Sequence, residues 1–269
     1  MKISIVTISY NQAQFLEQAI LSVLNQEDAD IEYIVVDPGS TDGSLEIIER
    51  YRSQLSKIIL EPDAGPADGL NKGFADATGD LFGFVNSDDI LLPGALKKIS
   101  DAFIAHPGAD VISGHALIID EHGKEIRKCY SEPFSLLGHA YGSTILMQPS
   151  TFFRSASFEN TGGFNVSNRS NWDGELFVGM AMQGARFELI DRFLSGYRLQ
   201  PESITSSGKM HQSIQDYQRH IFIKILGRIP DWRDPFIGNV LRLFKHIRSP
   251  RALYERISKG PIYRRHAKK

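Results

Sequence analysis

The stretch LFGFVNSDD, residues 81–89, decides how the rest of the chain is interpreted. Its first five residues are mostly apolar, as in a buried strand, and four small polar or acidic residues follow without a break. Pro93 then precedes an apolar-periodic run that predicts a helix over 95–103. We therefore expect Asp88 and Asp89 where a central strand meets its loop, the edge at which open α/β sheets bind ligands.

Two adjacent carboxylates repel each other unless a positive charge lies between them. Their hard oxygen atoms suit Mg²⁺ or Mn²⁺ carrying the phosphates of a substrate. The alternative is that Asp88 or Asp89 only caps the helix that follows, as acidic residues often do. The pair alone favours the helix cap. The other motifs of the chain favour the metal site.

The composition is that of an ordinary globular protein, with 269 residues, 42% hydrophobic and 23% charged. Cys129 is the only cysteine, so an intrachain disulfide is excluded and a reducing compartment fits. The N-terminus enters a strand-like run directly, without the apolar segment of a signal peptide, and no stretch is apolar enough to span a bilayer. We expect a cytoplasmic location.

Strand-like and helical patterns alternate through the first half of the chain. Strands are predicted at 3–8, 31–36, 58–60 and 81–85, with helices at 12–24, 45–51 and 67–77. This alternation predicts an α/β fold, with a parallel sheet covered on both faces. Further on, we predict a hairpin of 111–119 with 125–130, strands at 145–153, 186–190 and 193–199, and helices at 174–182, 214–226 and 239–247.

Polar loops follow the successive predicted strands. Because right-handed crossovers bring these loops to one edge of the sheet, they could form a nucleotide pocket. Asp37 could accept a hydrogen bond from a base N–H, and Tyr10 could lie against the ring. The alternatives are that Asp37 only holds its own turn and that Tyr10 only packs within its loop.

The motifs, taken in order, resemble those of the family 2 glycosyltransferases of the bacterial polysaccharide or O-antigen type. The resemblance covers roughly residues 3–200 and rests on VTISYN at 6–11, VDPGSTDG at 36–43, NKG at 71–73, NSDD at 86–89, QPSTFF at 148–153, GGF at 162–164 and WDGEL at 172–176. It implies the GT-A fold, a Rossmann-like, mostly parallel sheet with helices on both faces. It also implies an inverting transferase that uses a nucleotide sugar.

The resemblance further implies the residues of the site. The nucleotide-sugar contacts would come from Thr7, Ser9, Tyr10, Asp37, Asn71, Lys72, Asn86, Ser87 and Asp88. The metal, Mg²⁺ or Mn²⁺, would be held by Asp88 and Asp89, and Asp89 is the residue that usually meets the cation. Asn86 replaces a third acid found in many members, which predicts modest metal affinity.

Asp173 stands where the family keeps its catalytic base, with Glu175 as the second candidate and a simple helix cap as the alternative. Leu70 replaces a common arginine, Gly174 a common aromatic residue, and Gln200 a common histidine, for which His211 could compensate. The family usually takes UDP-sugars. Asp37 alone could equally receive an N–H from uracil, thymine or guanine.

We therefore expect transfer of a sugar to a glycan or lipid-linked oligosaccharide in cell-surface polysaccharide biosynthesis. Acceptor pockets are expected within the second half, including 138–143 and 165–171. One alternative is a catalytically silent binding module of the same fold. A sugar nucleotidyltransferase is less favoured, because residues 9–14 contain neither glycine nor a basic side chain for a phosphate loop.

Basic residues are concentrated at the C-terminus. Residues 236–269 hold ten Lys or Arg against one acid, Glu255, whereas the other 235 residues hold 20 basic and 31 acidic side chains. Two amphipathic helices separated by Pro250 are expected there, with apolar residues such as Leu241, Phe244 and Ile247. This pattern fits an anionic membrane surface, and so a peripheral position on the inner face of the cytoplasmic membrane.

The alternative is that the apolar stripe of these helices packs on the catalytic domain. Nucleic acid is disfavoured as a partner, because the negative balance of the other 235 residues would oppose it. We divide the chain into a GT-A catalytic domain, 1–206, and a basic helical extension, 207–269. Within the first, 1–104 would bind the donor and 105–206 the acceptor.

Overall fold

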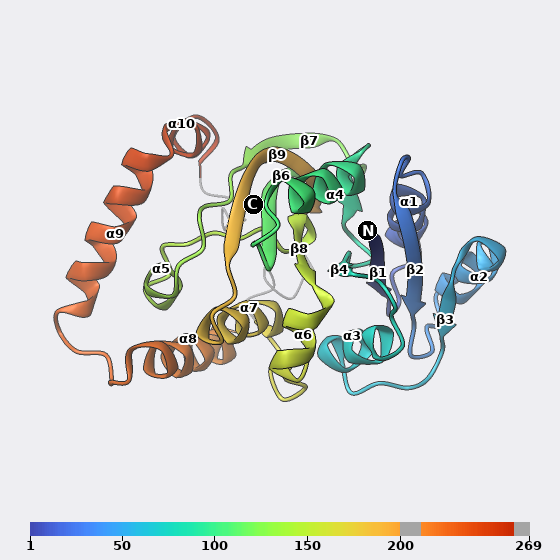
Figure 1. Ribbon diagram of the computed structural model, residues 1–269, viewed down its shortest axis with the longest axis horizontal. Helices are drawn as coiled ribbons and strands as arrows, with labels where there is room; N and C mark the ends of the chain where they lie inside the picture. The colour runs from blue at the N-terminus through green and yellow to red at the C-terminus, as the bar shows by residue number, and fades with distance from the viewer. Residues whose placement is uncertain (200–210, 261–269) are drawn as a thin grey trace, which may run out of the picture.

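The computed structural model describes residues 1–199 and 211–260, which form one nine-stranded sheet and the helices around it (Figure 1). The strands are β1 (Lys2–Ile8), β2 (Asp30–Val36), β3 (Lys57–Ile59), β4 (Leu81–Phe84), β5 (Ile90–Leu91), β6 (Val111–Ile119), β7 (Glu125–Cys129), β8 (Thr151–Arg154) and β9 (Phe187–Arg198). Their order is β3-β2-β1-β4-β8-β6-β9-β5, and β7 pairs with β6.

The first half confirms the predicted alternation. Strands β3, β2, β1 and β4 are parallel neighbours, joined through α1 (Ala13–Leu24), α2 (Ser44–Arg50) and α3 (Pro66–Ala75), and α4 (Ala95–Ala105) follows β5. Because these strands are parallel, the loops after β1, β2, β3 and β4 meet at one edge of the sheet. We call this edge the donor edge, after the nucleotide-sugar donor that is expected there from the sequence.

The second half differs in detail from the sequence prediction. Strand β8 runs antiparallel to β4 and β6, and β9 runs parallel to β6. The strand predicted at 145–153 starts only at Thr151, because Pro149 lies in a short 3-10 helix, η2 (Gln148–Ser150). The two strands predicted at 186–190 and 193–199 are one strand, β9, whose register shifts opposite 113–116 of β6. The short helices α5 (Leu136–Ala140) and α6 (Ser155–Thr161) were not predicted, whereas α7 (Trp172–Met182) was.

Apolar side chains fill both faces of the sheet. On one face, residues such as Leu16 of α1 and Leu96 of α4 pack against Ile3 and Ile5 of β1. On the other face, α3, α6 and α7 pack around a group of phenylalanine rings. Phe74 and Phe82 stack there with their centroids 4.7 Å apart, and such aromatic pairs add about 0.5–1.5 kcal/mol to simple burial. The helices on both faces fix the strand ends that carry the polar loops.

Three helices form the C-terminal extension: α8 (His211–Leu226), α9 (Asp234–Arg248) and α10 (Pro250–Lys259). Helix α8 packs on α5, and α10 packs on β7, while α9 lies along the rim of the molecule farthest from β3 (Figure 1). In the described parts of the chain, no helix is both long and apolar enough to cross a membrane.

Candidate active site

The loop after β2 is held by its own aspartate. Asp37 is fully buried; its Oδ1 accepts hydrogen bonds from the backbone N–H groups of Gly39 (3.0 Å) and Ser40 (2.7 Å), and its Oδ2 accepts one from Ser40 Oγ (2.7 Å). Gly39 has φ of 114°, a conformation that side chains other than hydrogen disfavour. Asp37 therefore shapes the turn, as the structural alternative predicted, and a base N–H would have to share an oxygen with it.

The side chains at the end of β1 and in the loop after it differ in their exposure. Thr7, in β1, is fully buried, and its hydroxyl lies 3.0 Å from the Tyr33 hydroxyl, so its side chain supports the strand end. The Ser9 hydroxyl is buried with no hydrogen-bond partner among the described residues. Tyr10 is 62% exposed, so its ring is free to lie against a base.

Asn71 and Lys72 also make contacts of their own. The Asn71 side chain donates to the carbonyl of Phe164 (2.9 Å) and accepts from its N–H (2.8 Å), which ties α3 to the segment before α7. Lys72 Nζ donates to the carbonyl of Pro62 and lies 3.6 Å from Asp68. In this arrangement Asn71 has a structural role, whereas Lys72 remains beside the loop that follows β3.

The acidic pair after β4 is not equally accessible. Asp88 is half-buried, but Asp89 is only 1% exposed, and its Oδ1 accepts a hydrogen bond from the backbone N–H of Arg198 (2.9 Å). Burial, and then the neighbouring charge of Asp88, raises the pKa of Asp89. Asp88 and Asp89 thus follow β4 where a loop was expected, but Asp89 lies under the surface and contacts β9.

The two residues before the acidic pair are also mostly enclosed. The Asn86 side chain donates to Gln148 Oε1 at 3.3 Å, and its own oxygen is buried without a partner among the described residues. Ser87 is 5% exposed and its N–H donates to the carbonyl of Ile8 (3.2 Å). The main chain here is thus fixed to β1, which makes the position of Asp88 rigid.

Arg198 at the end of β9 organises this region and was missed in the sequence analysis. It is 1% exposed, and its guanidinium lies over the Phe15 ring, 4.7 Å from the centroid. Its side chain donates hydrogen bonds of 2.7–2.9 Å to the main-chain oxygens of Asp88, Asp120 and Glu121 and to Gln18 Oε1. A charged residue within an otherwise apolar strand pattern was the available signal, because such residues are rarely buried unless paired.

The residues at this edge fit one divalent cation. Asp89 Oδ2 is buried with no hydrogen-bond partner among the described residues, and Asp88 is the next residue in the chain. A cation would satisfy that oxygen and neutralise the repulsion that raises the pKa of Asp89. No group of three or more His, Cys, Asp or Glu side chains suited to a metal occurs in the described residues. The remaining positions on such an ion would therefore belong to water and substrate phosphates.

Asp173 occupies the first turn of α7, next to the donor edge. The Trp172 ring lies 6.4 Å from the ring of Phe84, the last residue of β4, which brings this helix start beside the strand that leads to Asp88. Burial raises the pKa of Asp173, although backbone N–H groups at the helix start oppose the change. A carboxylate in this state accepts a proton more readily than an exposed aspartate does.

Glu175, the second candidate for the base, is already engaged. Its two carboxylate oxygens accept hydrogen bonds from the side chains of Asn165 (3.1 Å) and Asn168 (2.7 Å). These bonds order the loop before α7 and leave Asp173 as the better candidate. Gln200 and the side chain of His211 lie outside the described residues.

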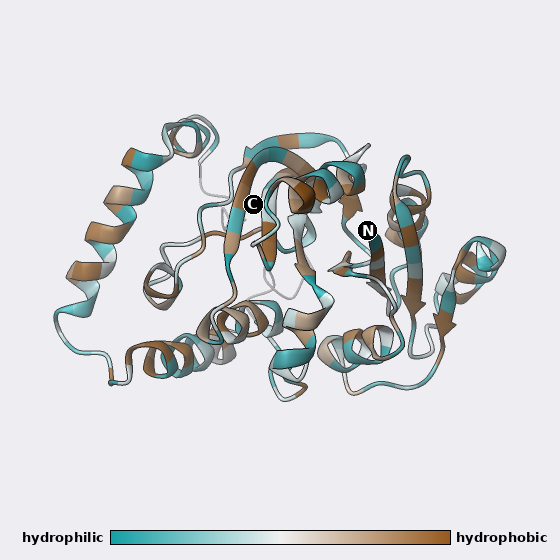
Figure 2. Cartoon of the chain, viewed as in Figure 1, coloured by the Kyte–Doolittle hydropathy of each residue, from teal (hydrophilic) through white to brown (hydrophobic). Residues whose placement is uncertain are grey.

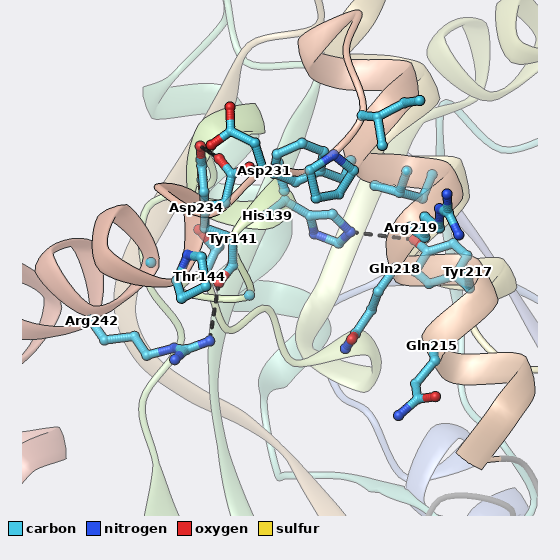
Figure 3. A pocket seen from close by; sticks show the side chains of 18 of the residues that line it. His139, Tyr141, Thr144, Gln215, Tyr217, Gln218, Arg219, Asp231, Asp234 and Arg242 are labelled. Atoms are coloured by element: carbon cyan, nitrogen blue, oxygen red, sulfur yellow. Dashed lines mark hydrogen bonds between the residues drawn. The ribbon is translucent and has the colours of Figure 1, made fainter.

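A neutral pair, His139 and Tyr217, lies beside Asp173 and was also missed. His139 Nε2 and the Tyr217 hydroxyl are 3.3 Å apart (Figure 3). Burial lowers the pKa of His139 to about 4, whereas burial and the charges of Asp173 and Glu175 raise the pKa of Tyr217. Both groups are therefore uncharged at neutral pH and could position a hydroxyl near Asp173.

Comparison with known proteins identifies the class of protein. Residues 4–166 match the family described as glycosyl transferase family 2, and the chain belongs to that family. It is 28% identical over 210 residues to "Putative teichuronic acid biosynthesis glycosyltransferase TuaG" of Bacillus subtilis, covering 76% of this chain and 82% of that protein.

Two further relatives match about half of the chain. An uncharacterized glycosyltransferase of Nostoc is 39% identical over 129 residues, 47% of this chain, and the match spans only 40% of that relative. "O-antigen biosynthesis protein RfbC" of Myxococcus xanthus is 33% identical over 49% of this chain and 10% of its own length. These matches support a transferase of the bacterial polysaccharide type.

Solved structures confirm the GT-A fold prediction. S. aureus TarS 1–349 in complex with UDP-GlcNAc has a TM-score of 0.63 at 21% identity, covering 84% of this chain and 72% of that one. The mannosyltransferase PcManGT from Pyrobaculum calidifontis, in complex with GDP-Man and Mn²⁺, has a TM-score of 0.64 at 19% identity, covering 96% and 73%.

Proposed function

We propose that this protein transfers a sugar, with inversion, from a nucleotide-diphosphate sugar to a hydroxyl of a glycan or lipid-linked acceptor. A UDP-sugar is the proposed donor, and cell-surface polysaccharide biosynthesis is the proposed process. The observation that carries the proposal is Asp173, a carboxyl of raised pKa beside the strand end that bears Asp88 and Asp89. Support comes from neighbours solved with UDP-GlcNAc or GDP-Man and from relatives named for teichuronic acid and O-antigen biosynthesis.

In this proposal, the donor edge holds the nucleotide. The Tyr10 ring lies against the base, the Ser9 hydroxyl gains a hydrogen-bond partner, and the Asp37 turn limits the size of the base site. Asp88 and Asp89 would hold Mg²⁺ or Mn²⁺, which when bound would offset the charge of the diphosphate leaving group. Residues 1–104 thus bind the donor, 105–206 the acceptor, and 207–269 form the extension.

Asp173 takes the proton from the acceptor hydroxyl. The hydroxyl oxygen forms its bond to the anomeric carbon as the bond from that carbon to the diphosphate oxygen breaks. The electron pair of the broken bond leaves with the nucleoside diphosphate. A single displacement of this kind inverts the anomeric centre and requires no covalent enzyme intermediate.

The Asp173→Asn variant tests the role of the base. It keeps the size of the side chain but removes its basicity, so turnover should fall by about 10²–10⁴-fold while affinity for UDP-GlcNAc stays within about twofold of wild type. Glu175→Gln is the matched control and should retain most of the turnover. Normal turnover in Asp173→Asn would transfer the assignment to another group, and absence of turnover in the wild type would favour a silent binding module.

The metal proposal has a separate readout. Mn²⁺ should increase the thermal stabilisation that UDP-GlcNAc gives the wild-type protein, and Asp88→Asn should abolish that increase. Lys97→Gln, a change at an exposed position on α4, is the control. Equal stabilisation by UDP-GlcNAc with and without excess chelator would contradict a metal-dependent donor site.

We also propose that α9 and α10 attach the protein to an anionic membrane surface. Phe236, Ile247 and Ile257 are 72%, 67% and 75% exposed, and further apolar side chains on the same helices are exposed with them. Hydrophobic and hydrophilic residues alternate along α9 (Figure 2). Exposed basic residues interleave with this apolar surface, namely Arg248, Arg251 and Arg256. Apolar side chains among cations match the interface of an anionic bilayer.

The contacts of the opposite side explain this orientation. Asp234 and Glu255 are buried against the rest of the protein, and Lys245 lies 3.1 Å from Glu132. Leu241 is half-buried, but Phe244 is 53% exposed. The alternative that the whole apolar stripe packs on the catalytic domain therefore receives little support.

Vesicle co-sedimentation tests the membrane proposal. The wild type should bind phosphatidylglycerol vesicles, bind phosphatidylcholine vesicles weakly, and dissociate as salt is raised. The double variant Phe244→Ser, Ile247→Ser should lose this binding, whereas Ile104→Ser, at an exposed apolar position on α4, should not. Equal binding to both lipids, or unchanged binding of the double variant, would contradict the proposal.

A further inference from the structure

A cavity of about 830 Å³ lies between the catalytic half and the extension (Figure 3). It is formed by α5, α8, the first turns of α9 and the segment between α8 and α9. Its volume is within the range of about 300–1,000 Å³ typical of small-molecule sites. None of the donor-edge residues described above lines it, so it is distinct from the proposed nucleotide site.

The cavity opens beside the proposed base. Asn171, two residues before Asp173, lines it together with His139 and Tyr217. A Cβ added to Gly174 would lie 2.9 Å from the Tyr217 hydroxyl, so the extension reaches directly onto the first turn of α7. Glycine at position 174 leaves room for that contact. A ligand in the cavity would therefore be adjacent to Asp173.

The uncharged groups of the lining suit a sugar ring. Tyr141, Tyr217 and Phe222 supply aromatic faces and edges, and Gln215, Gln218 and Asn239 supply side-chain amides. Amides can donate to and accept from neighbouring hydroxyls at once, and aromatic rings can pack on the C–H faces of a pyranose. A purely apolar ligand would leave the hydrogen-bonding groups of these amides without partners.

The charged groups of the lining favour an anion. The two acids are neutralised by arginines outside the lining, since Asp234 accepts from Arg228 at 2.9 Å and Asp231 lies 2.8 Å from Arg233. The two cations of the lining have no such partner among the described residues. Within residues 1–199 and 211–260, Arg242 contacts only neutral oxygens, at 3.3 and 3.5 Å, and the exposed Arg219 has no ion pair.

We propose that this cavity binds the acceptor as an anionic saccharide, so that α8 and α9 of the extension would share the acceptor site with residues 105–206. The amides and rings would hold the sugar, while Arg219 and Arg242 would contact a phosphate or carboxylate attached to it. The Tyr217 hydroxyl and the neutral His139 would hold the reacting hydroxyl toward Asp173. This inference rests on the proposed transferase function and names the chemical class of its acceptor.

Binding of small saccharides to the full-length protein tests the inference without requiring turnover. Glucose 1-phosphate, glucuronic acid and glucose would be titrated against the UDP-loaded protein and followed by ligand-observed NMR. At least one anionic probe should bind about tenfold more tightly than glucose, and the double variant Arg219→Gln, Arg242→Gln should lose that preference. Preference for the phosphate would indicate a phosphate-linked acceptor, and preference for the carboxylate an acidic sugar.

Two controls separate the outcomes. Arg186→Gln, at an exposed position just before β9 and outside the cavity, should bind the probes as the wild type does. UDP-GlcNAc affinity should be the same in all variants, so loss of donor binding would count against the proposed function and not against the cavity. Equal affinity for glucose and both anions, or a preference that survives in the double variant, would overturn the inference.

Tyr217→Phe provides a kinetic test of the positioning role. Removal of the hydroxyl should raise the KM for the acceptor or lower kcat with acceptor, but should leave slow hydrolysis of UDP-GlcNAc by water unchanged. A purely structural role for Tyr217 would instead lower both rates in proportion to the loss of folded protein. Unchanged transfer kinetics would remove Tyr217 from the acceptor site.

Discussion

At the donor edge, Asp37, Asp89 and Arg198 lie beneath the surface and are held mainly by main-chain atoms. Along α9 and α10, by contrast, apolar side chains face outward and several charges face the rest of the protein. Arg198 bonds three carbonyls in the first region. In the second, Lys245 pairs with Glu132, and Arg251 pairs with Asp191 at 3.0 Å on the surface. Charged side chains thus fix the main chain in the first region and form ion pairs between elements in the second.

The difference shows what an amphipathic pattern does and does not determine. Periodicity places the apolar residues of α9 on one stripe, but the direction of that stripe depends on the contacts of the opposite side. Asp234 and Lys245 find partners on the catalytic half, so part of the apolar stripe is left facing outward. At the donor edge, by contrast, burial decides which of two adjacent acids is accessible.

The largest effect is expected from Arg198→Met. The variant leaves several buried carbonyl oxygens without a donor, and removal of one partner of a buried charged network commonly costs about 3–5 kcal/mol. Urea unfolding monitored by circular dichroism would measure the loss. A change of less than about 1 kcal/mol would show that Arg198 does not fix the donor edge.

Lys245→Met should have a smaller effect. It leaves Glu132, whose pKa is already raised by burial, without its cation in a largely buried pair. Because both side chains keep some exposure, we expect the free energy of unfolding to fall by about 2 kcal/mol, less than for a fully buried pair. The double variant Lys245→Met, Glu132→Gln should recover part of this loss, and failure to recover any would contradict a role for the ion pair itself.

Asp89→Asn should change the pH dependence of stability. The folded-state pKa of Asp89 is raised, so the folded protein holds the proton more tightly, and this contribution is fully present below the unfolded pKa, about 4. It is lost as the pH rises through the folded value. Relative to the variant, the wild type should therefore lose stability as the pH rises above about 4, in metal-free buffer.

The asparagine in that variant can still accept the hydrogen bond from Arg198, so the fold should be retained. Asp89→Ala cannot, and should be less stable than Asp89→Asn at every pH. If the free energies of unfolding of wild type and Asp89→Asn change in parallel between pH 4 and 8, the pKa of Asp89 is not raised in the folded protein.

The smallest effect is expected from Arg251→Ala. Arg251 and Asp191 are both about two-thirds exposed, and such surface pairs contribute below about 1 kcal/mol. The free energy of unfolding should change by about 0.5 kcal/mol or less, measured under the same conditions as Arg198→Met. A loss similar to that of Arg198→Met would remove the distinction between the two regions.

The fold of the first half was predictable because its apolar periodicity is local. Strands β1, β2 and β4 and helices α1, α3 and α4 each carry the pattern in consecutive residues. The strand predicted over 145–153 was too long, although Pro149 between two polar residues favours a break where η2 lies. Strand β9 was split in two because Asp191 and Arg192 break its apolar pattern, although its pairing with β6 continues on both sides.

For the candidate site, the motifs predicted which loops meet, but not how each side chain is used. Thr7 and Asn71 turned out to hold the structure, since each has a partner from another element. The pairing of His139 with Tyr217 joins residues 78 positions apart, which no local pattern reveals. The roles of Asp88, Asp89 and Asp173 remain predictions that the variants above examine.

The hydrogen bond from Arg198 to Gln18 has a consequence for synthesis of the chain, because it joins residues 180 positions apart. At translation rates of about 5–20 residues per second, Arg198 follows Gln18 from the ribosome after roughly 9–36 seconds. During that interval, the carbonyls of Asp88 and Asp120 lack their donor, and β6 lacks its parallel neighbour. Long-range parallel pairing is slow, so the acidic pair should reach its final position late in folding. A nascent chain that ends before β9 would therefore expose an unfinished donor edge to chaperones.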